Sequence, residues 1–173
     1  MQTKKLTRLS MLLALSLVLG ILESFLPILN GMIPGIKLGL ANIPVLVTLY
    51  LFGAKEAIFV SFMRVLLMGL LRTGLFTISF YFSLFGAFFS IFIMILAKKS
   101  NWFSLVGISM LGAIFHTLGQ MIAVLLFLKT TAMLAYLPIL LCCSIGSGLL
   151  IGFCSKELLE ILKKQLRPSK NMI

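Results

Sequence analysis

Long apolar segments are the feature that most restricts how this chain can fold. They follow one another over most of its 173 residues, and 61% of the residues are hydrophobic. A helix needs about 20 mostly apolar residues to cross the hydrocarbon core of a bilayer. With so many hydrophobic residues, too few polar side chains remain to cover the surface of a water-soluble protein. The sequence therefore predicts an all-α integral membrane protein.

We expect a bundle of six membrane-spanning helices in one domain that comprises residues 1–173. Glycine, proline and the polar group at 98–101 separate the apolar segments. Because the second and third segments are short, an arrangement of five helices remains open. The apolar segments continue almost to the end of the chain, so we expect no cleaved signal peptide. The expected helices are 9–28, 36–52, 54–71, 74–97, 103–128 and 132–153, followed by a basic cytoplasmic tail over 154–173.

The basic residues are distributed unevenly among the connections. The net charge of +11 suggests nucleic-acid binding, but that function needs basic residues clustered on a water-exposed face. If the N-terminus is cytoplasmic, 11 of the 15 basic residues lie on the cytoplasmic side, three lie outside and Arg64 lies within a helix. By the positive-inside rule, we expect a multi-pass cell-membrane protein with both termini in the cytoplasm.

The last basic segment has leucine and isoleucine between its charged residues from Lys156 to Lys170. Such a segment lies on the inner leaflet as an amphipathic helix, or it simply extends the last span. The sequence leaves both arrangements open.

Groups for catalysis are scarce. The chain has no aspartate, and three of its four glutamates lie at cytoplasmic helix ends. No carboxylate pair is therefore available within the membrane for acid–base chemistry or for holding Mg²⁺ on a phosphate. The chain also lacks a phosphate-binding Gly-rich loop, and its three cysteines lack metal-ligand spacing. We expect neither autonomous catalysis nor ATP hydrolysis, and no cofactor or metal site.

Polar residues within the apolar segments lie mostly in the outer half of the expected bundle. The run from Pro34 to Pro44 places Lys37 and Asn42 among helix-disrupting residues at the mouth of a span. Intramembrane ionisable groups are costly and usually face a bundle interior or an aqueous cavity. Because bases outnumber acids in this layer, we expect an anionic or strongly hydrogen-bond-accepting solute. The candidate ligand-binding residues are Glu23, Lys37, Asn42, Arg64, Arg72, His116 and Gln120.

Each of these residues also has a purely structural interpretation. Glu23 could neutralise Lys37 or Arg72, because buried charges are normally paired. His116 and Gln120 could bridge helices by hydrogen bonds. An arginine in this layer could extend to the interface or anchor the helix there.

Small residues four positions apart mark helix faces that can approach another helix closely. The last expected helix carries three of them, beginning at Ser144. Packing within the bundle explains these faces, but the first helix could also present its small residues to a separate membrane partner. The candidate docking residues on that helix are Ser10, Ala14, Ser16 and Gly20.

Two motifs and the pattern of spans resemble a known family. The run PGIKLGLANI at 34–43, the preceding ESFLP at 23–27 and six short spans resemble the family labelled heptaprenyl diphosphate synthase component I, also called the Gx transporter family. In architecture that family is similar to the substrate-binding S components of energy-coupling factor transporters. This likeness implies a six-helix bundle with an outward-facing pocket. S components typically carry Ala-x-x-x-Ala on the first helix, whereas the nearest matches here are Ser10/Ala14 and Ser16/Gly20.

The resemblance implies two different functions. An S-component-like subunit would capture a small anionic or amphipathic solute from the outer side and pass it inward with an energy-coupling transmembrane subunit and ATPases. Alternatively, the chain would be a non-catalytic membrane component of heptaprenyl diphosphate synthase beside a soluble polyprenyl synthase subunit. Known prenyl synthases need aspartate-rich metal sites, which a chain without aspartate cannot supply. We expect the transport function first.

Overall fold

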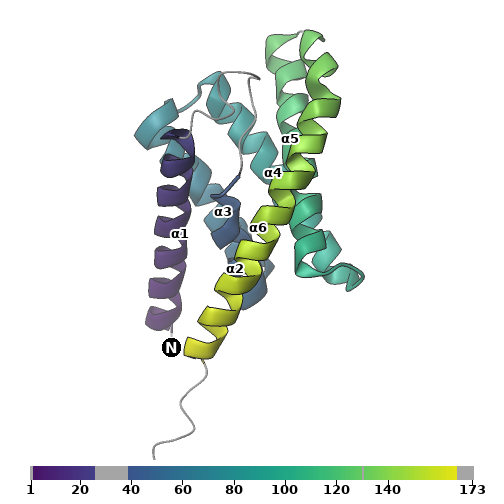
Figure 1. Cartoon of the computed structure of the whole chain (residues 1–173). Helices are drawn as coiled ribbons and strands as arrows, with labels where there is room; N and C mark the ends of the chain where they lie inside the picture. Colours follow the sequence, from purple (N-terminus) through teal and green to yellow (C-terminus); the bar gives the residue numbers. More distant parts are fainter. Residues whose placement is uncertain (1, 26–38, 130, 167–173) are drawn as a thin grey trace, which may run out of the picture.

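The computed structural model describes residues 2–25, 39–129 and 131–166. Every regular element in these ranges is helical, which confirms the all-α prediction (Figure 1). A π-helical turn, η1, follows the third helix, and a 3-10 turn, η2, precedes the last. The elements are α1 (Gln2–Phe25), α2 (Asn42–Leu51), α3 (Ala54–Met68), η1 (Gly69–Thr73), α4 (Ile78–Ser100), α5 (Leu105–Leu128), η2 (Ala132–Tyr136) and α6 (Leu137–Leu166).

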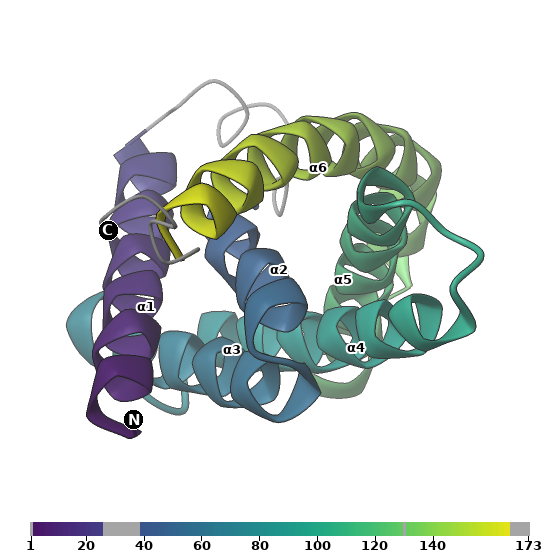
Figure 2. The ribbon, with the colours of Figure 1, turned by 90° about the horizontal axis from the view of Figure 1, so that it is seen from below.

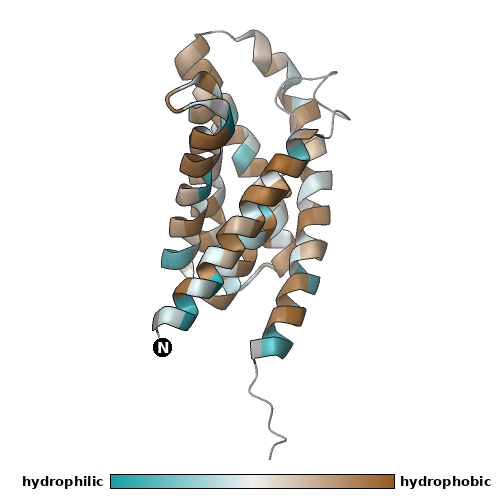
Figure 3. Cartoon of the chain, turned by 90° about the vertical axis from the view of Figure 1, so that its left-hand side faces the viewer, coloured by the Kyte–Doolittle hydropathy of each residue, from teal (hydrophilic) through white to brown (hydrophobic). Residues whose placement is uncertain are grey.

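Four of these helices are long and apolar enough to cross a membrane, namely α1, α4, α5 and α6. Hydrophobic residues follow most of their length (Figure 3). By contrast, α2 has 10 residues and α3 has 15. At 1.5 Å per residue, α2 is only about 15 Å long and cannot cross the hydrocarbon core alone. The described part of the chain thus has four helices that could cross a membrane, whereas α2 and α3 are too short to do so by length alone.

The second helix begins later than the sequence predicts. Residues 36–38 lie outside the described ranges, but Gly39–Ala41 forms a turn and α2 starts at Asn42, so a helix starting at 36 is wrong. Gly39 has φ +76°, a left-handed conformation that an α-helix excludes and that glycine adopts readily. Pro44 fits the first turn, where its missing N–H leaves no partner unsatisfied. Residues 43–49 are all buried, and α2 lies inside a ring of the other helices (Figure 2).

The last helix continues beyond its expected end at 153. It runs without a break to Leu166, so the described part of the basic segment extends the last span and is not a separate helix. Leu159 is buried against Leu12 of α1 and Val47 of α2. Ser155 is also fully buried. The cytoplasmic extension expected from the sequence is therefore part of the bundle.

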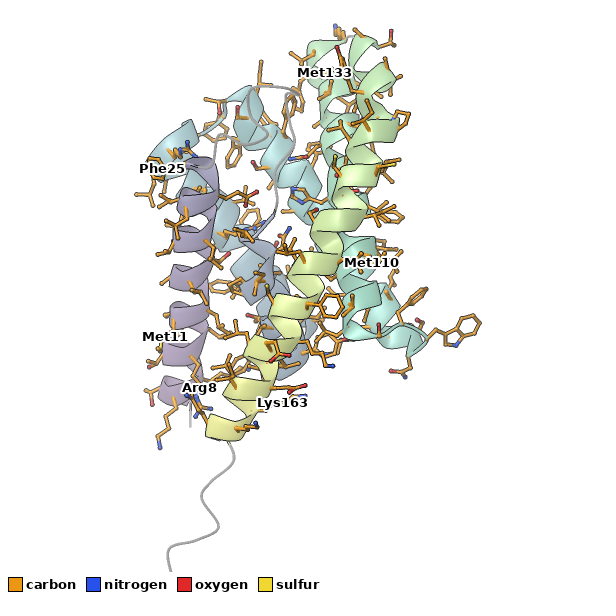
Figure 4. The ribbon with its side chains drawn as sticks, viewed as in Figure 1. Arg8, Met11, Phe25, Met110, Met133 and Lys163 are labelled. Carbon is orange, nitrogen blue, oxygen red and sulfur yellow. The ribbon has the colours of Figure 1, made fainter. Side chains whose placement is uncertain are left out.

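The described chain begins and ends at the same end of the bundle (Figure 1). Arg8 and Lys163 both lie at this end (Figure 4). Lys5 forms an ion pair with Glu56 at the start of α3. Lys98 Nζ donates a hydrogen bond of 2.6 Å to the Leu49 carbonyl oxygen near the end of α2. Lys5, Arg8 and Lys163 thus lie at the end where the described chain begins and ends, while the side of the membrane that this end faces stays a prediction.

Small residues let α6 approach α5 closely. A β-carbon added at Gly148 would lie 2.8 Å from Met110 Cα, and one added at Gly152 would lie 2.9 Å from Val106 Cα. Such distances to backbone atoms leave no room for a side chain. The small-residue face of the last helix therefore serves packing within the bundle.

Replacing Gly148 by leucine should destabilise the fold, because the new side chain meets the α5 backbone. We expect a loss of about 1–3 kcal/mol, the usual cost of overpacking. Gly146→Leu is the matched control, since a β-carbon at Gly146 has nothing within 4 Å. Thermal unfolding of the two variants in detergent provides the measurement. Equal melting temperatures would show that the α5–α6 contact does not restrict side-chain size at position 148.

Candidate functional site

Helix α1, the turn before α2 and helix α3 meet at one place. Ser16 Oγ donates a hydrogen bond of 2.6 Å to the Ala41 carbonyl oxygen, and Ser16 is fully buried. A β-carbon at Gly20 would lie 3.5 Å from both Ala41 Cβ and Met68 Cε. The small residues of α1 thus allow close approach of the turn and of α3. We call this place the Gly39 junction; it comprises Ser16, Gly20, Glu23, Gly39, Ala41, Asn42, Arg64 and Met68.

Glu23 holds the turn at the Gly39 junction. Its carboxylate accepts a hydrogen bond of 2.6 Å from the Gly39 N–H. The amide nitrogen of Asn42 would lie 3.3 Å from a β-carbon at Gly39, and Ile151 Cδ1 would lie 3.2 Å from it. A side chain at position 39 would therefore be crowded as well as strained. Asn42 and Glu23 are both partly buried, and both side chains lie close to Gly39.

Arg64 brings a buried positive charge to this junction. Its side chain is 7% exposed, and the negative charge that acts on it is that of Glu23. With the described residues it forms no hydrogen bond and no salt bridge. A guanidinium has five N–H donors, which favour anionic groups or water as partners. The geometry therefore leaves Arg64 able to bind an anionic group or ordered water.

Two other predicted residues lie apart from these contacts. His116 and Gln120 are on α5 and face Gly86 of α4, where a β-carbon would lie 2.8 Å from His116 Cε1 and 3.0 Å from Gln120 Cγ. Both are partly buried. They occupy the α4–α5 contact, which favours the helix-bridging interpretation over a ligand role.

The remaining predicted ligand residues are not part of the described junction. Arg72 is exposed in η1, as an interfacial anchor would be. Lys37 lies outside the described residues. Among the residues that the structure describes, no three histidine, cysteine or glutamate side chains lie close enough to hold a metal ion.

The structure divides the candidate docking residues between two faces of α1. Ser10 and Ala14 are exposed. Ser16 and Gly20 face the interior and contact the turn, so they are not accessible to a partner. Only the first pair remains available for docking.

Sequence reasoning missed the contacts that organise the junction. For Glu23 we considered ligand contact or neutralisation of Lys37 or Arg72, whereas in the described part of the chain it binds the Gly39 N–H and its charge acts on Arg64. The signal was present in Gly39 itself, since a glycine between apolar residues often marks a turn. The identity of its hydrogen-bond partner depends on how α1 packs, which no local pattern shows.

A sequence model of the family described as heptaprenyl diphosphate synthase component I matches residues 12–158. The match includes every residue of the Gly39 junction, and it confirms the family that the two motifs resemble. Comparisons with curated proteins and with solved structures gave no match.

The contributions of Glu23 and Arg64 to the free energy of unfolding should depend on each other. Glu23→Gln keeps an oxygen that accepts from Gly39 but removes the charge near Arg64, so we expect a loss of about 1–3 kcal/mol in unfolding free energy. Arg64→Met removes the need for that charge, and the double variant should recover part of the loss. A double-mutant cycle on the unliganded protein should give a coupling of about 0.5–3 kcal/mol. Strictly additive effects would mean that the two side chains do not interact.

Proposed function

The chain belongs to the heptaprenyl diphosphate synthase component I family, and for this member we propose the role of a membrane-embedded, substrate-binding transporter subunit similar to an S component. It captures a small anionic or amphipathic solute from the outer side. An ATP-driven partner complex then provides the energy for uptake.

The observation that carries this proposal is the buried Arg64 at the Gly39 junction. Arginine forms paired, charge-assisted hydrogen bonds with carboxylate and phosphate groups. Glu23 compensates its charge only in part, because the Glu23 carboxylate also binds Gly39. An anionic group of the solute would complete the set, with the Asn42 amide as a further contact. Lys37 remains a proposed contact from the same run of sequence.

The proposed orientation places both termini in the cytoplasm, with six crossings. Arg8 and Lys163 then lie at the cytoplasmic end, while Phe25 lies at the opposite, outer end (Figure 4). Glu23 is two residues before Phe25, so its carboxylate lies toward the outer side. This orientation gives the solute access from outside.

The exposed face of α1 is the proposed contact for the coupling subunit. Ser10 and Ala14 are small and exposed, and Met11 and Val18 are 67% and 52% exposed on the same helix. Small residues on a lipid-facing helix permit close contact with another membrane helix. Docking there leaves the inner face of α1 in contact with the turn.

The family description itself favours a second candidate. The chain would then be a non-catalytic membrane component of heptaprenyl diphosphate synthase that binds a soluble polyprenyl synthase subunit. This role needs no catalytic residues in the chain. It predicts a different partner and needs no captured solute.

Orientation is testable by labelling single cysteines at positions 5 and 170 in a variant without the three native cysteines. An impermeant thiol reagent should label neither position in intact cells and both after permeabilisation. Labelling of either position in intact cells would overturn the proposed orientation of that terminus.

Solute and partner binding should be separable by two variants purified from native membranes. Arg64→Gln should lose the bound solute but keep the partner, because Arg64 is internal. We expect solute binding to weaken by about 1.5–3 kcal/mol, the scale of charge-assisted hydrogen bonds. Ala14→Leu should keep the solute and lose the partner. Mass spectrometry of the co-purified small molecules and proteins measures solute binding and partner binding.

The identity of the partner separates the two functions. ATPases with wild-type protein support transport, whereas a soluble polyprenyl synthase with no bound solute supports the second candidate. Arg64→Lys, which keeps the charge, is the control for folding at this position. Solute retention by Arg64→Gln at the wild-type level would contradict a binding role for Arg64.

A further inference from the structure

A groove of about 480 Å³ lies between α3 and α4, away from the Gly39 junction. Its floor includes Ser61 and Ala87, which are 4% and 5% exposed. Its rim includes Ile58, Phe62 and Phe88, which are 47–63% exposed. Apart from Ser61, all lining residues are apolar. The volume lies within the range of about 300–1,000 Å³ found for small-ligand pockets.

The groove follows from the sizes of the side chains along the two helices. Small residues face each other on the floor, whereas large aromatic residues stand on the rim, so the helices leave a channel between them. Val65 and Ala87 close its floor by packing with Phe80. Arg64, although next to Val65 in the chain, is not part of the lining. The groove is therefore separate from the proposed solute site.

Exposed lysines lie beyond the cytoplasmic end of both groove walls. Lys55 is three residues before Ile58 on α3, and so lies on the same face of that helix. Lys99 follows Phe88 by eleven residues on α4, which is again the same face. Both lysines are exposed, in contrast to Lys98, whose amino group binds the Leu49 carbonyl oxygen.

The connection after α4 has the features of a membrane interface. Trp102 is 89% exposed next to the lysines at 98 and 99. Tryptophan is enriched at headgroup level, where its ring is partly apolar and its N–H can reach a polar partner. Ile91, at the near end of the groove, is eight residues from Lys99, or about 12 Å along the helix axis. This spacing suits a headgroup at Lys99 and a hydrocarbon chain in the groove.

We propose that this groove binds one acyl chain of an anionic phospholipid, with the phosphate near Lys55 and Lys99. The apolar walls would accept the chain of any lipid, but the lysines add an attraction that a zwitterionic lipid lacks. The lipid belongs to the leaflet at the N-terminal end of the bundle. The site differs from the solute site in position and in the chemistry of its ligand.

A tryptophan in the groove can report which lipid lies beside it. Trp102 is the only tryptophan of the chain, so Trp102→Phe gives a background without fluorescence from that residue type. Phe62→Trp then places a reporter on the rim. Phe153→Trp is the matched control, because Phe153 is 60% exposed on α6, near Lys156, and does not line the groove. The full-length variants are reconstituted with brominated phosphatidylglycerol or brominated phosphatidylcholine.

At position 62, phosphatidylglycerol should quench at a several-fold lower mole fraction than phosphatidylcholine. The preference should disappear in Lys55→Gln/Lys99→Gln and persist in Lys156→Gln. At position 153 the two lipids should quench alike. The proposal is overturned by equal quenching at position 62, by an unchanged preference without Lys55 and Lys99, or by an equal preference at position 153. Displacement of the brominated lipid by low concentrations of an isoprenoid diphosphate would also overturn it and assign the groove to that class.

Discussion

The structure depends on a short, buried helix, α2, and on the turn that precedes it. α2 has only 10 residues, and its first and last turns leave backbone groups without partners inside the helix. In hydrocarbon those groups have no water to bind. Lys98 meets this need in the last turn, where it binds the Leu49 carbonyl. In the turn before α2, Glu23 binds the Gly39 N–H and Ser16 binds the Ala41 carbonyl. Polar contacts thus hold α1 against the turn before α2, and α4 against the last turn of α2.

These polar contacts also bring charge to the proposed solute site. Glu23 is required at the turn, and its carboxylate is then near Arg64. The resulting combination is a buried cation with an acidic neighbour that is already hydrogen-bonded elsewhere. Arg64 can therefore attract an anion, and Glu23 offsets part of its positive charge when no anion is bound. Structure and proposed function therefore share the same residues.

Much of the fold could be predicted from local patterns. Apolar length gave the fifth helix at 103–128, and the structure has α5 from Leu105 to Leu128. The start of α2 could not be placed, because the apolar residues around Gly39 continue across the turn. The docking face was only half predictable. Ala14 and Ser16 are two residues apart, about 200° around a helix, so the pairs Ser10/Ala14 and Ser16/Gly20, each with a spacing of four, lie on different faces.

The site residues were predicted less well than the helices, because their partners come from distant segments. That His116 and Gln120 share a face follows from their spacing of four. That Gly86 lies opposite them depends on where α4 and α5 cross. Glu23 and Arg64 were both candidates, but neither the proximity of their charges nor the bond from Gly39 to Glu23 was predicted. The position of Lys37 stays a prediction.

Helix α1 links its exposed face to the Gly39 junction inside the bundle. Few of its residues are buried, and polar contacts hold it near both ends, through Lys5 to Glu56 and through Glu23 to Gly39. A helix is stiff along its axis, whereas a hydrogen bond of 2.6 Å is lost after a displacement of about 1 Å. A small sliding or tilting of α1 would therefore release the turn. A partner protein that binds the exposed face of α1 can therefore disturb the Gly39 junction without contacting the interior of the bundle.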